Sequence, residues 1–143
     1  DIILANKTIM YYIIEPMGDS KAAIADYTTN IDLNWLGNRY PTNVIQTVLV
    51  SADKDLSTDE IEKLQLQYNA VAGDWESGAI AYTAARNKVK LLILRGVSDL
   101  VSMQKGEAYG NFELFEQRAE AVMLKLLDIL PAWIGYIESL PSK

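Results

Sequence analysis

The sequence contains neither cysteine nor histidine. Without cysteine the chain can form no disulfide and no thiolate metal site, a composition that fits a reducing cytoplasm, where we expect the protein to lie. Without histidine, every Ser-His and Cys-His catalytic arrangement is excluded, and a metal ion would have to be bound by carboxylates alone. We therefore expect a site without metal or cofactor.

Basic residues and long apolar runs are also scarce. The 13 lysines and arginines are outnumbered by 19 aspartates and glutamates, which gives a formal net charge of −6. This balance argues against a nucleic-acid partner, because the phosphate backbone requires a basic face. No apolar run approaches the ~20 residues that span a membrane, and nothing resembles a secretory leader. A small neutral or cationic ligand is the partner that the composition favours.

Half of the 143 residues are hydrophobic, which predicts a single domain over residues 1–143. The chain is organised around residues 71–99, which contain a short apolar piece, a small-residue helix over 75–87 and a continuous apolar run over 89–97. Continuous apolarity predicts a strand buried on both faces, and hence a strand–helix–strand unit of a parallel sheet. Ligands bind at the carboxyl edge of such sheets, where Glu76 opens the helix and Asp99 follows the second strand. Two carboxylates are thus predicted to meet in one crevice.

Each of these carboxylates has a structural and a functional interpretation. Glu76 lies where the helix dipole and free backbone N–H groups stabilise an acid, and Asp99 lies where an acid commonly caps a turn. Alternatively, the Glu76 carboxylate can accept hydrogen bonds from two adjacent hydroxyls of a sugar, which fixes the ring as positive charge develops at its anomeric carbon. The residues alone leave both interpretations open.

The same residues resemble the C-terminal signature of the nucleoside phosphorylase and nucleosidase superfamily. In that superfamily a D/E-M-E-A/G-A-type segment is followed, one helix and one strand later, by a Ser-Asp pair. The matching residues are Asp74, Trp75, Glu76, Ser77, Gly78 and Ala79, and then Ser98 and Asp99. The pattern is most similar to the nucleosidases that act on 5′-methylthioadenosine and S-adenosylhomocysteine. The resemblance covers most of residues 1–130 in element order and is specific over residues 75–100.

The resemblance implies a role for each matching side chain. Glu76 would bind the ribose hydroxyls, and Asp99 would act as the general acid that protonates N7 of the purine, oriented by a hydrogen bond from Ser98. Arg95 should point away from Asp99. Trp75 occupies the place of a methionine that packs under the sugar, although an ordinary core tryptophan is an alternative.

The loop before residue 57 departs from the pattern of the superfamily. Members grip the purine there with a stacking side chain that is usually aromatic or leucine. Asp55 occupies that position, or the position is missing if the loop is one residue shorter; Leu56 is the residue that could substitute for it. The identity of the base is therefore open.

For the whole chain, the resemblance implies a three-layer αβα fold with a mixed, phosphorylase/hydrolase-like sheet. The chain opens at Asp1, directly in an apolar run, so we expect the C-terminal part of a larger enzyme that lacks its N-terminal portion. The implied reaction is hydrolysis of the N-glycosidic bond of a purine nucleoside, as in methionine salvage. Phosphorolysis is less favoured because no arginine follows Asp99 before Arg118. A non-catalytic nucleoside-binding domain of this fold is the alternative of another class.

The resemblance also implies a homodimer, in which residues 17–41 lie at the subunit interface. Those residues are rich in turn formers and poor in periodicity, so a surface loop anchored by Trp35 and Leu36 is an equal alternative. One helical turn is predicted over residues 22–25.

The remaining elements follow from periodicity and capping signals. Strands are predicted over residues 1–5, 8–14 and 43–51, with a tight turn at Asn6 and Lys7. A capping box of Ser57 and Glu60 should start a helix whose inward residues are Ile61, Leu64 and Tyr68.

A long helix should begin after Asn111 and end before Pro131, followed by a short second helix. The apolar stripe of the long helix should pack on the sheet; it comprises Phe115, Ala119, Val122, Met123, Leu126, Leu127 and Leu130. In the loop before it, Lys105 and Glu107 are predicted to be solvated.

Overall fold

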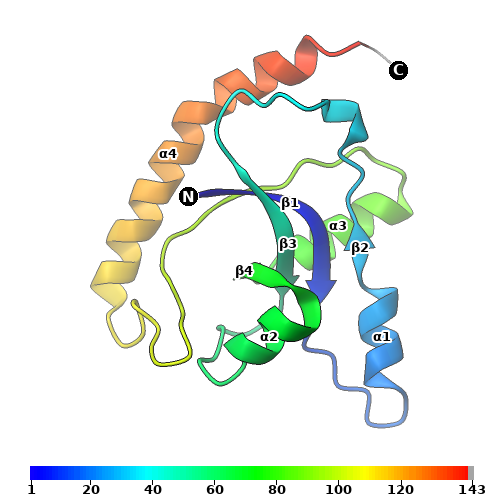
Figure 1. Cartoon of the computed structure of the whole chain (residues 1–143), viewed down its shortest axis with the longest axis vertical. Coiled ribbons are helices and arrows are strands. Elements are labelled where there is room, and N and C mark those ends of the chain that lie inside the picture. Colours follow the sequence, from blue (N-terminus) through cyan, green and yellow to red (C-terminus); the bar gives the residue numbers. More distant parts are fainter. Residues whose placement is uncertain (142–143) are drawn as a thin grey trace.

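The computed structural model describes residues 1–141, which form a mixed sheet with helices on both sides (Figure 1). The strands are β1 Ile2–Met10, β2 Thr29–Asn30, β3 Ile45–Ser51, β4 Ala70–Asp74 and β5 Leu94–Gly96. The helices are α1 Ser20–Asp26, α2 Ile61–Tyr68, α3 Ser77–Arg86 and α4 Phe112–Glu138, and η1 Asn34–Leu36 is a 3₁₀ helix. Figure 1 shows α2 in front of the sheet, α3 behind it and α4 along one side.

Strand β1 is the centre of the sheet. It runs parallel to β3, which runs parallel to β4, while β2 and β5 pair antiparallel with the other edge of β1. The predicted division of this segment into two strands with a turn at Asn6 and Lys7 is wrong. The pairing of β1 with β3 continues across these residues with a register shift between Ala5 and Lys7, at the point where β1 changes its antiparallel partner from β5 to β2. The polar pair therefore marks an irregularity within a strand.

The predicted parallel strand over residues 89–97 is also wrong. Only Leu94–Gly96 forms a strand, and it is antiparallel to β1 and separated from β4 by β1 and β3. The residues before it are apolar because they pack into the core in an irregular conformation, with Ile93 buried and Leu91 and Leu92 packed against the core. The continuous apolar run therefore indicates that these residues are in the core, and it does not indicate that they pair as a strand.

Helices α2 and α3 lie where the sequence predicts helices. The inward face of α2 is confirmed, since Ile61 and Leu64 are buried and Tyr68 is half-buried. The capping box is wrong: Glu60 is the N-cap but its side chain forms no capping hydrogen bond, and it pairs instead with Lys54 at 2.8 Å. The Ser57 hydroxyl bonds to Asp59.

Residues 17–41 are more ordered than a loop. They contain α1, capped by the Asp19 carboxylate, then β2 and η1. The predicted helical turn is confirmed as part of α1. Leu36 is fully buried and Trp35 half-buried, so this segment is anchored to the body as predicted.

Helix α4 is one continuous element of 27 residues with Pro131 inside it, so the predicted break is wrong. Trp133 anchors the part beyond Pro131, because its side chain is 1% exposed, stacks on Tyr40 with centroids 5.7 Å apart and donates from Nε1 to the Thr42 hydroxyl at 2.9 Å. Asn111 caps the helix as predicted, by accepting a hydrogen bond from the backbone of Leu114.

The apolar stripe of α4 is less buried than predicted. Val122 packs on β5, where a Cβ at Gly96 would overlap with it. Phe115, Met123, Leu127 and Leu130, however, are 44–57% exposed. In the preceding loop Lys105 is exposed, but Glu107 pairs with Arg118 at 2.5 Å instead of being solvated. Within residues 1–141, no helix is both long and apolar enough to cross a membrane.

Candidate functional site

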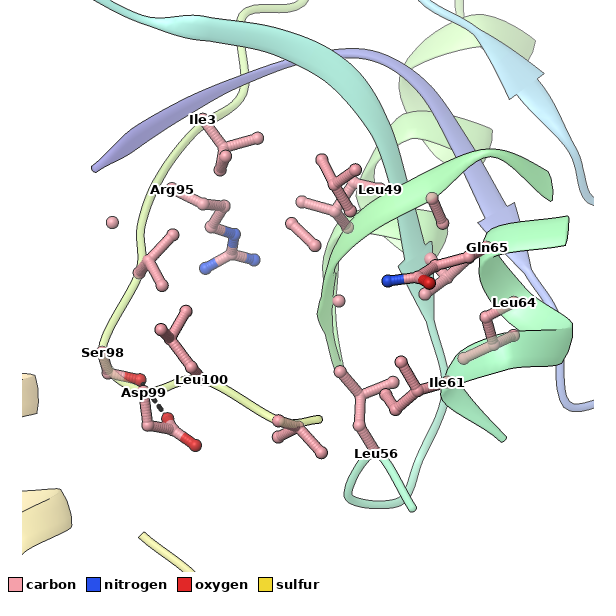
Figure 2. Close-up of a pocket in the computed structure, with 18 residues that line it drawn as sticks. Ile3, Leu49, Leu56, Ile61, Leu64, Gln65, Arg95, Ser98, Asp99 and Leu100 are labelled. Carbon is pink, nitrogen blue, oxygen red and sulfur yellow. Dashed lines mark hydrogen bonds between the residues drawn. The ribbon is translucent and has the colours of Figure 1, made fainter. Parts of the chain in front are cut away.

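A cavity of about 190 Å³ lies between the sheet and the segment that follows β5. One wall consists of β3, β4 and α2, and the other of residues 95–101 (Figure 2). Ser98, Asp99 and Leu56, three of the predicted site residues, line this cavity together with Arg95. Figure 2 shows Ser98 and Asp99 on one side and Leu56 across the opening from them.

Asp99 reaches the cavity by a different path from the predicted one. Because β5 is antiparallel to β1, its end lies beside the start of β1, where the Val97 amide donates to the Asp1 carbonyl at 3.1 Å. Figure 2 shows the chain continuing along the cavity wall from Arg95 to Ser98 and bending there, which places Asp99 at the cavity.

The Ser98 hydroxyl donates a 2.7 Å hydrogen bond to one Asp99 carboxylate oxygen. Both residues are half-buried. In the described part of the chain, the Asp99 side chain accepts no backbone hydrogen bond, so the turn-capping interpretation is not supported. Arg95 points elsewhere, as expected. Asp99 therefore presents a carboxyl group to the cavity with one neighbouring hydroxyl to orient it.

Glu76 is linked to the cavity through Arg95. Its carboxylate is 61% exposed and lies 3.1 Å from Nη2 of Arg95, which lines the cavity. Glu76 is the N-cap residue of α3, but its side chain forms no capping hydrogen bond. Asp74 accepts the bond from the Ser77 amide instead, at 3.0 Å. Glu76 thus stands at the N-terminus of α3, where the helix dipole favours an acid as predicted, but its side chain does not bond to the free backbone N–H groups.

Sequence reasoning missed that Asp74 and Arg95 belong together. Nε of Arg95 lies 2.7 Å from the Asp74 carboxylate, which is 13% exposed. Two signals were available: Asp74 precedes Ser77 by three residues, a spacing typical of a side-chain cap, and Arg95 interrupts an apolar run. A cation in such a run requires a carboxylate partner, because burying it unpaired is costly.

Trp75, Glu76 and Asp55 are outside the cavity wall formed by the described residues. Trp75 is 53% exposed, so it is not a core tryptophan. Leu56 rather than Asp55 faces the cavity, and it packs so closely on β4 that a Cβ at Gly73 would lie 3.0 Å from its Cδ1. The exposed Asp55 instead affects Tyr109, in the loop before α4. Burial raises the pKa of Tyr109, and the charges of Asp55 and Asp99 raise it further.

Tyr11, whose phenol lies next to Glu60, makes the stability of the fold depend on pH. Burial raises the pKa of the Tyr11 phenol to about 12, and the charge of Glu60 acts in the same direction. The pKa of Tyr11 in the folded state lies above the ordinary value of about 10, so the folded protein holds the phenolic proton more tightly than the unfolded chain does. The contribution of this proton to the free energy of unfolding is complete below pH ~10 and is lost as the pH rises through about 12. We expect the urea midpoint to fall between pH 9 and pH 11.5, and to fall less in Tyr11→Phe. An equal fall in both proteins would contradict this assignment.

The fold defined by this mixed sheet and its flanking helices is that of nucleosidases. The chain matches the apo form of the Arabidopsis thaliana 5′-methylthioadenosine nucleosidase with a TM-score of 0.72, 23% identity and coverage of 99% of this chain and 55% of that chain. It matches a Helicobacter pylori nucleosidase variant that has 5′-methylthioadenosine in its active site. The TM-score is 0.64 and the identity 15%, over 92% of this chain and 61% of that chain. It matches the futalosine hydrolase of Helicobacter pylori with a TM-score of 0.70 and 15% identity, over 94% of this chain and 60% of that chain.

These matches confirm the predicted fold class, with a mixed α/β sheet in the arrangement of 5′-methylthioadenosine/S-adenosylhomocysteine nucleosidases. The chain spans 55–61% of the length of these three structures. No protein-family model and no curated protein matches the sequence. Within residues 1–141, no group of three or more acidic side chains is arranged to hold a metal ion.

Proposed function

We propose that the chain belongs to an enzyme that hydrolyses the N-glycosidic bond of a purine nucleoside, with 5′-methylthioadenosine or S-adenosylhomocysteine as substrate. The observation that carries this proposal is the hydrogen-bonded pair of Ser98 and Asp99 in a cavity that Leu56 and Arg95 also line, with the Glu76 carboxylate 3.1 Å from Nη2 of Arg95. Similar folds support it, since one neighbour holds 5′-methylthioadenosine and another holds adenine.

In the proposed reaction the bond between C1′ of the ribose and N9 of the purine breaks, and its electron pair goes to the base. Asp99, oriented by Ser98, protonates N7, so the base leaves as a neutral molecule. Glu76 accepts hydrogen bonds from the two ribose hydroxyls and stabilises the positive charge that develops on the sugar. Leu56 contacts the base, with Asp55 at its exposed edge, and Trp75 lies under the sugar. Water adds at C1′, and the proton that it loses balances the one that Asp99 supplies.

We further propose that residues 1–143 are the C-terminal part of a single nucleoside phosphorylase-like domain. The share of the neighbours that the chain covers, and the exposed apolar residues of α4, support this view. A homodimer in the cytoplasm, active in methionine salvage and without a cofactor, completes the proposal.

The test is chromatographic detection of free purine after incubation with 5′-methylthioadenosine. It is carried out with the 143-residue chain and with the longest natural polypeptide that contains it, with and without phosphate. Free adenine without phosphate is the expected result. Release only with phosphate would replace hydrolysis by phosphorolysis.

A nucleoside-binding domain without turnover is the second candidate, and the departure of the loop around Asp55 and Leu56 from the pattern of the superfamily favours it. In that case 5′-methylthioadenosine would bind to the protein and be recovered intact. The proposed reaction would then be wrong.

A further inference from the structure

Asp74 is held by an unusual number of partners. Its carboxylate, at the end of β4, accepts hydrogen bonds from the Ser51 hydroxyl at 2.7 Å and from the Ser77 amide at 3.0 Å. The Ser77 hydroxyl also donates to it, and Nε of Arg95 lies 2.7 Å from it. A cap for α3 would need only the bond from Ser77. The remaining bonds indicate that the position of Asp74 matters for more than the helix.

The partners of Asp74 are themselves fixed by the packing of the fold. Ser51 is buried at the end of β3, and its hydroxyl, which donates to Asp74, accepts a 2.8 Å hydrogen bond from the Gly78 amide. A Cβ at Gly78 would lie 2.5 Å from Cγ of Met10 and 3.0 Å from Cβ of Ser51, so α3 begins in close contact with β1 and β3. Asp74 is therefore attached to a closely packed part of the sheet, where α3 meets β1 and β3.

Arg95 extends this fixed position toward the cavity. Its Nε lies 2.7 Å from Asp74 and also donates to the Ser77 hydroxyl at 3.0 Å, while Nη2 donates to the Glu76 carboxylate at 3.1 Å. The guanidinium is planar, so bonds to two carboxylates determine its orientation. Figure 2 shows it between the segment that carries Ser98 and strand β4.

Glu76 is the exposed end of this chain of contacts. Its side chain is 61% exposed, and Arg95 is its ion-pair partner in the described residues. An exposed carboxylate on a flexible stem loses conformational entropy when a ligand orders it. A carboxylate that is already held loses less.

We propose that Asp74 is a positioning residue: through Arg95 it holds the Glu76 carboxylate in place for the ribose hydroxyls before the nucleoside binds. The inference rests on the proposed function for the role of Glu76, but the coupling of Asp74 to Glu76 is a property of the protein without ligand. A purely structural Asp74 would affect every ligand of the cavity alike. A positioning Asp74 affects ligands that carry ribose and spares the free base.

The test compares Asp74→Asn with the matched control Asp26→Asn. Asp26 also pairs with an arginine, Arg86, at 3.4 Å, but this pair is exposed and lies outside the cavity wall. Two measurements are made on the full chain: the ¹³C NMR signal of the Glu76 carboxylate without ligand, identified by its loss in Glu76→Gln, and the affinities for 5′-methylthioadenosine and adenine.

In Asp74→Asn we expect the Glu76 signal to move and the affinity for 5′-methylthioadenosine to fall roughly tenfold, the effect of losing hydrogen bonds to a charged group, while adenine binds as before. The control should change neither. An unmoved Glu76 signal, or a parallel loss for both ligands, would overturn the inference.

Failure of the proposed function gives a different result. If the unmodified protein binds neither ligand, the nucleoside role is wrong, and the NMR signal still decides whether Asp74 positions Glu76. If Asp74→Asn does not fold, Arg95→Lys replaces it, because a lysine keeps the charge but cannot bond to both carboxylates in the fork geometry. The same difference between the two ligands is then expected.

Discussion

Replacing Asp99 with asparagine is expected to lower the rate of purine release roughly 10²–10⁴-fold, the usual contribution of a general acid. The amide has nearly the same shape as the carboxyl group and still accepts the hydrogen bond from Ser98, but it cannot transfer a proton to N7. The affinity for 5′-methylthioadenosine should therefore remain. Chromatography of released adenine measures the rate, and equilibrium dialysis of the intact nucleoside measures the affinity.

Asp128→Asn is the matched control. It is the same chemical change, made at an exposed residue of α4. It should leave both rate and affinity unchanged. If Asp99→Asn changes only the affinity and not the rate, Asp99 is a binding residue and the proposed mechanism is wrong. If both variants release adenine at the rate of the unmodified protein, the cavity described above is not the site of the reaction.

Trp133→Ala is expected to lower the free energy of unfolding by about 3–5 kcal/mol, as other tryptophan-to-alanine changes in cores do. The indole is 1% exposed, so its removal leaves a cavity, ends the stacking on Tyr40 and leaves Thr42 without its donor. This change acts on the part of α4 that lies beyond Pro131. Urea unfolding followed by circular dichroism measures the loss.

Two controls separate burial from the hydrogen bond. Ile134→Ala alters the adjacent residue, which is 48% exposed, and should change stability by less than about 1 kcal/mol. Trp133→Phe keeps an aromatic ring beside Tyr40 but loses the hydrogen bond to Thr42. Its loss of unfolding free energy should therefore lie between those of Trp133→Ala and Ile134→Ala. A loss in Trp133→Ala as small as that in Ile134→Ala would mean that α4 does not pack on the body beyond Pro131.

Several elements could be predicted from sequence because their causes are local. Asn111 caps α4 through an atom three residues away, and the inward face of α2 follows from the spacing of Ile61 and Leu64. Strand β3 was predicted because its segment is too rich in apolar residues to be half exposed. The candidate site residues were identified through a resemblance, since the segment from Asp74 to Ala79 and the Ser98–Asp99 pair are similar to the signature of the nucleoside phosphorylase and nucleosidase superfamily.

Local signals failed where an element's partner is distant in the sequence. Nothing in the run before Gly96 specifies that β5 is antiparallel to β1, because continuous apolarity is shared by strands and by irregular core segments. Pro131 predicts a helix end, but the burial of Trp133 against Tyr40 and Thr42 keeps α4 continuous across it. The apolar residues of α4 have the spacing of a core helix, and this spacing does not show whether another element covers them.

The sequence by itself determined the chemistry available to this protein: carboxylates without histidine, cysteine or a basic surface, in a spacing similar to that of nucleosidases. Only the tertiary structure decided which of those groups meet. It placed Asp99 in a cavity opposite Leu56, left Asp55 outside that cavity, and joined Asp74 to Glu76 through Arg95. The physical reason is that residue type and spacing are properties of the chain, whereas the pairing of a charged group depends on which distant segments the core brings beside it.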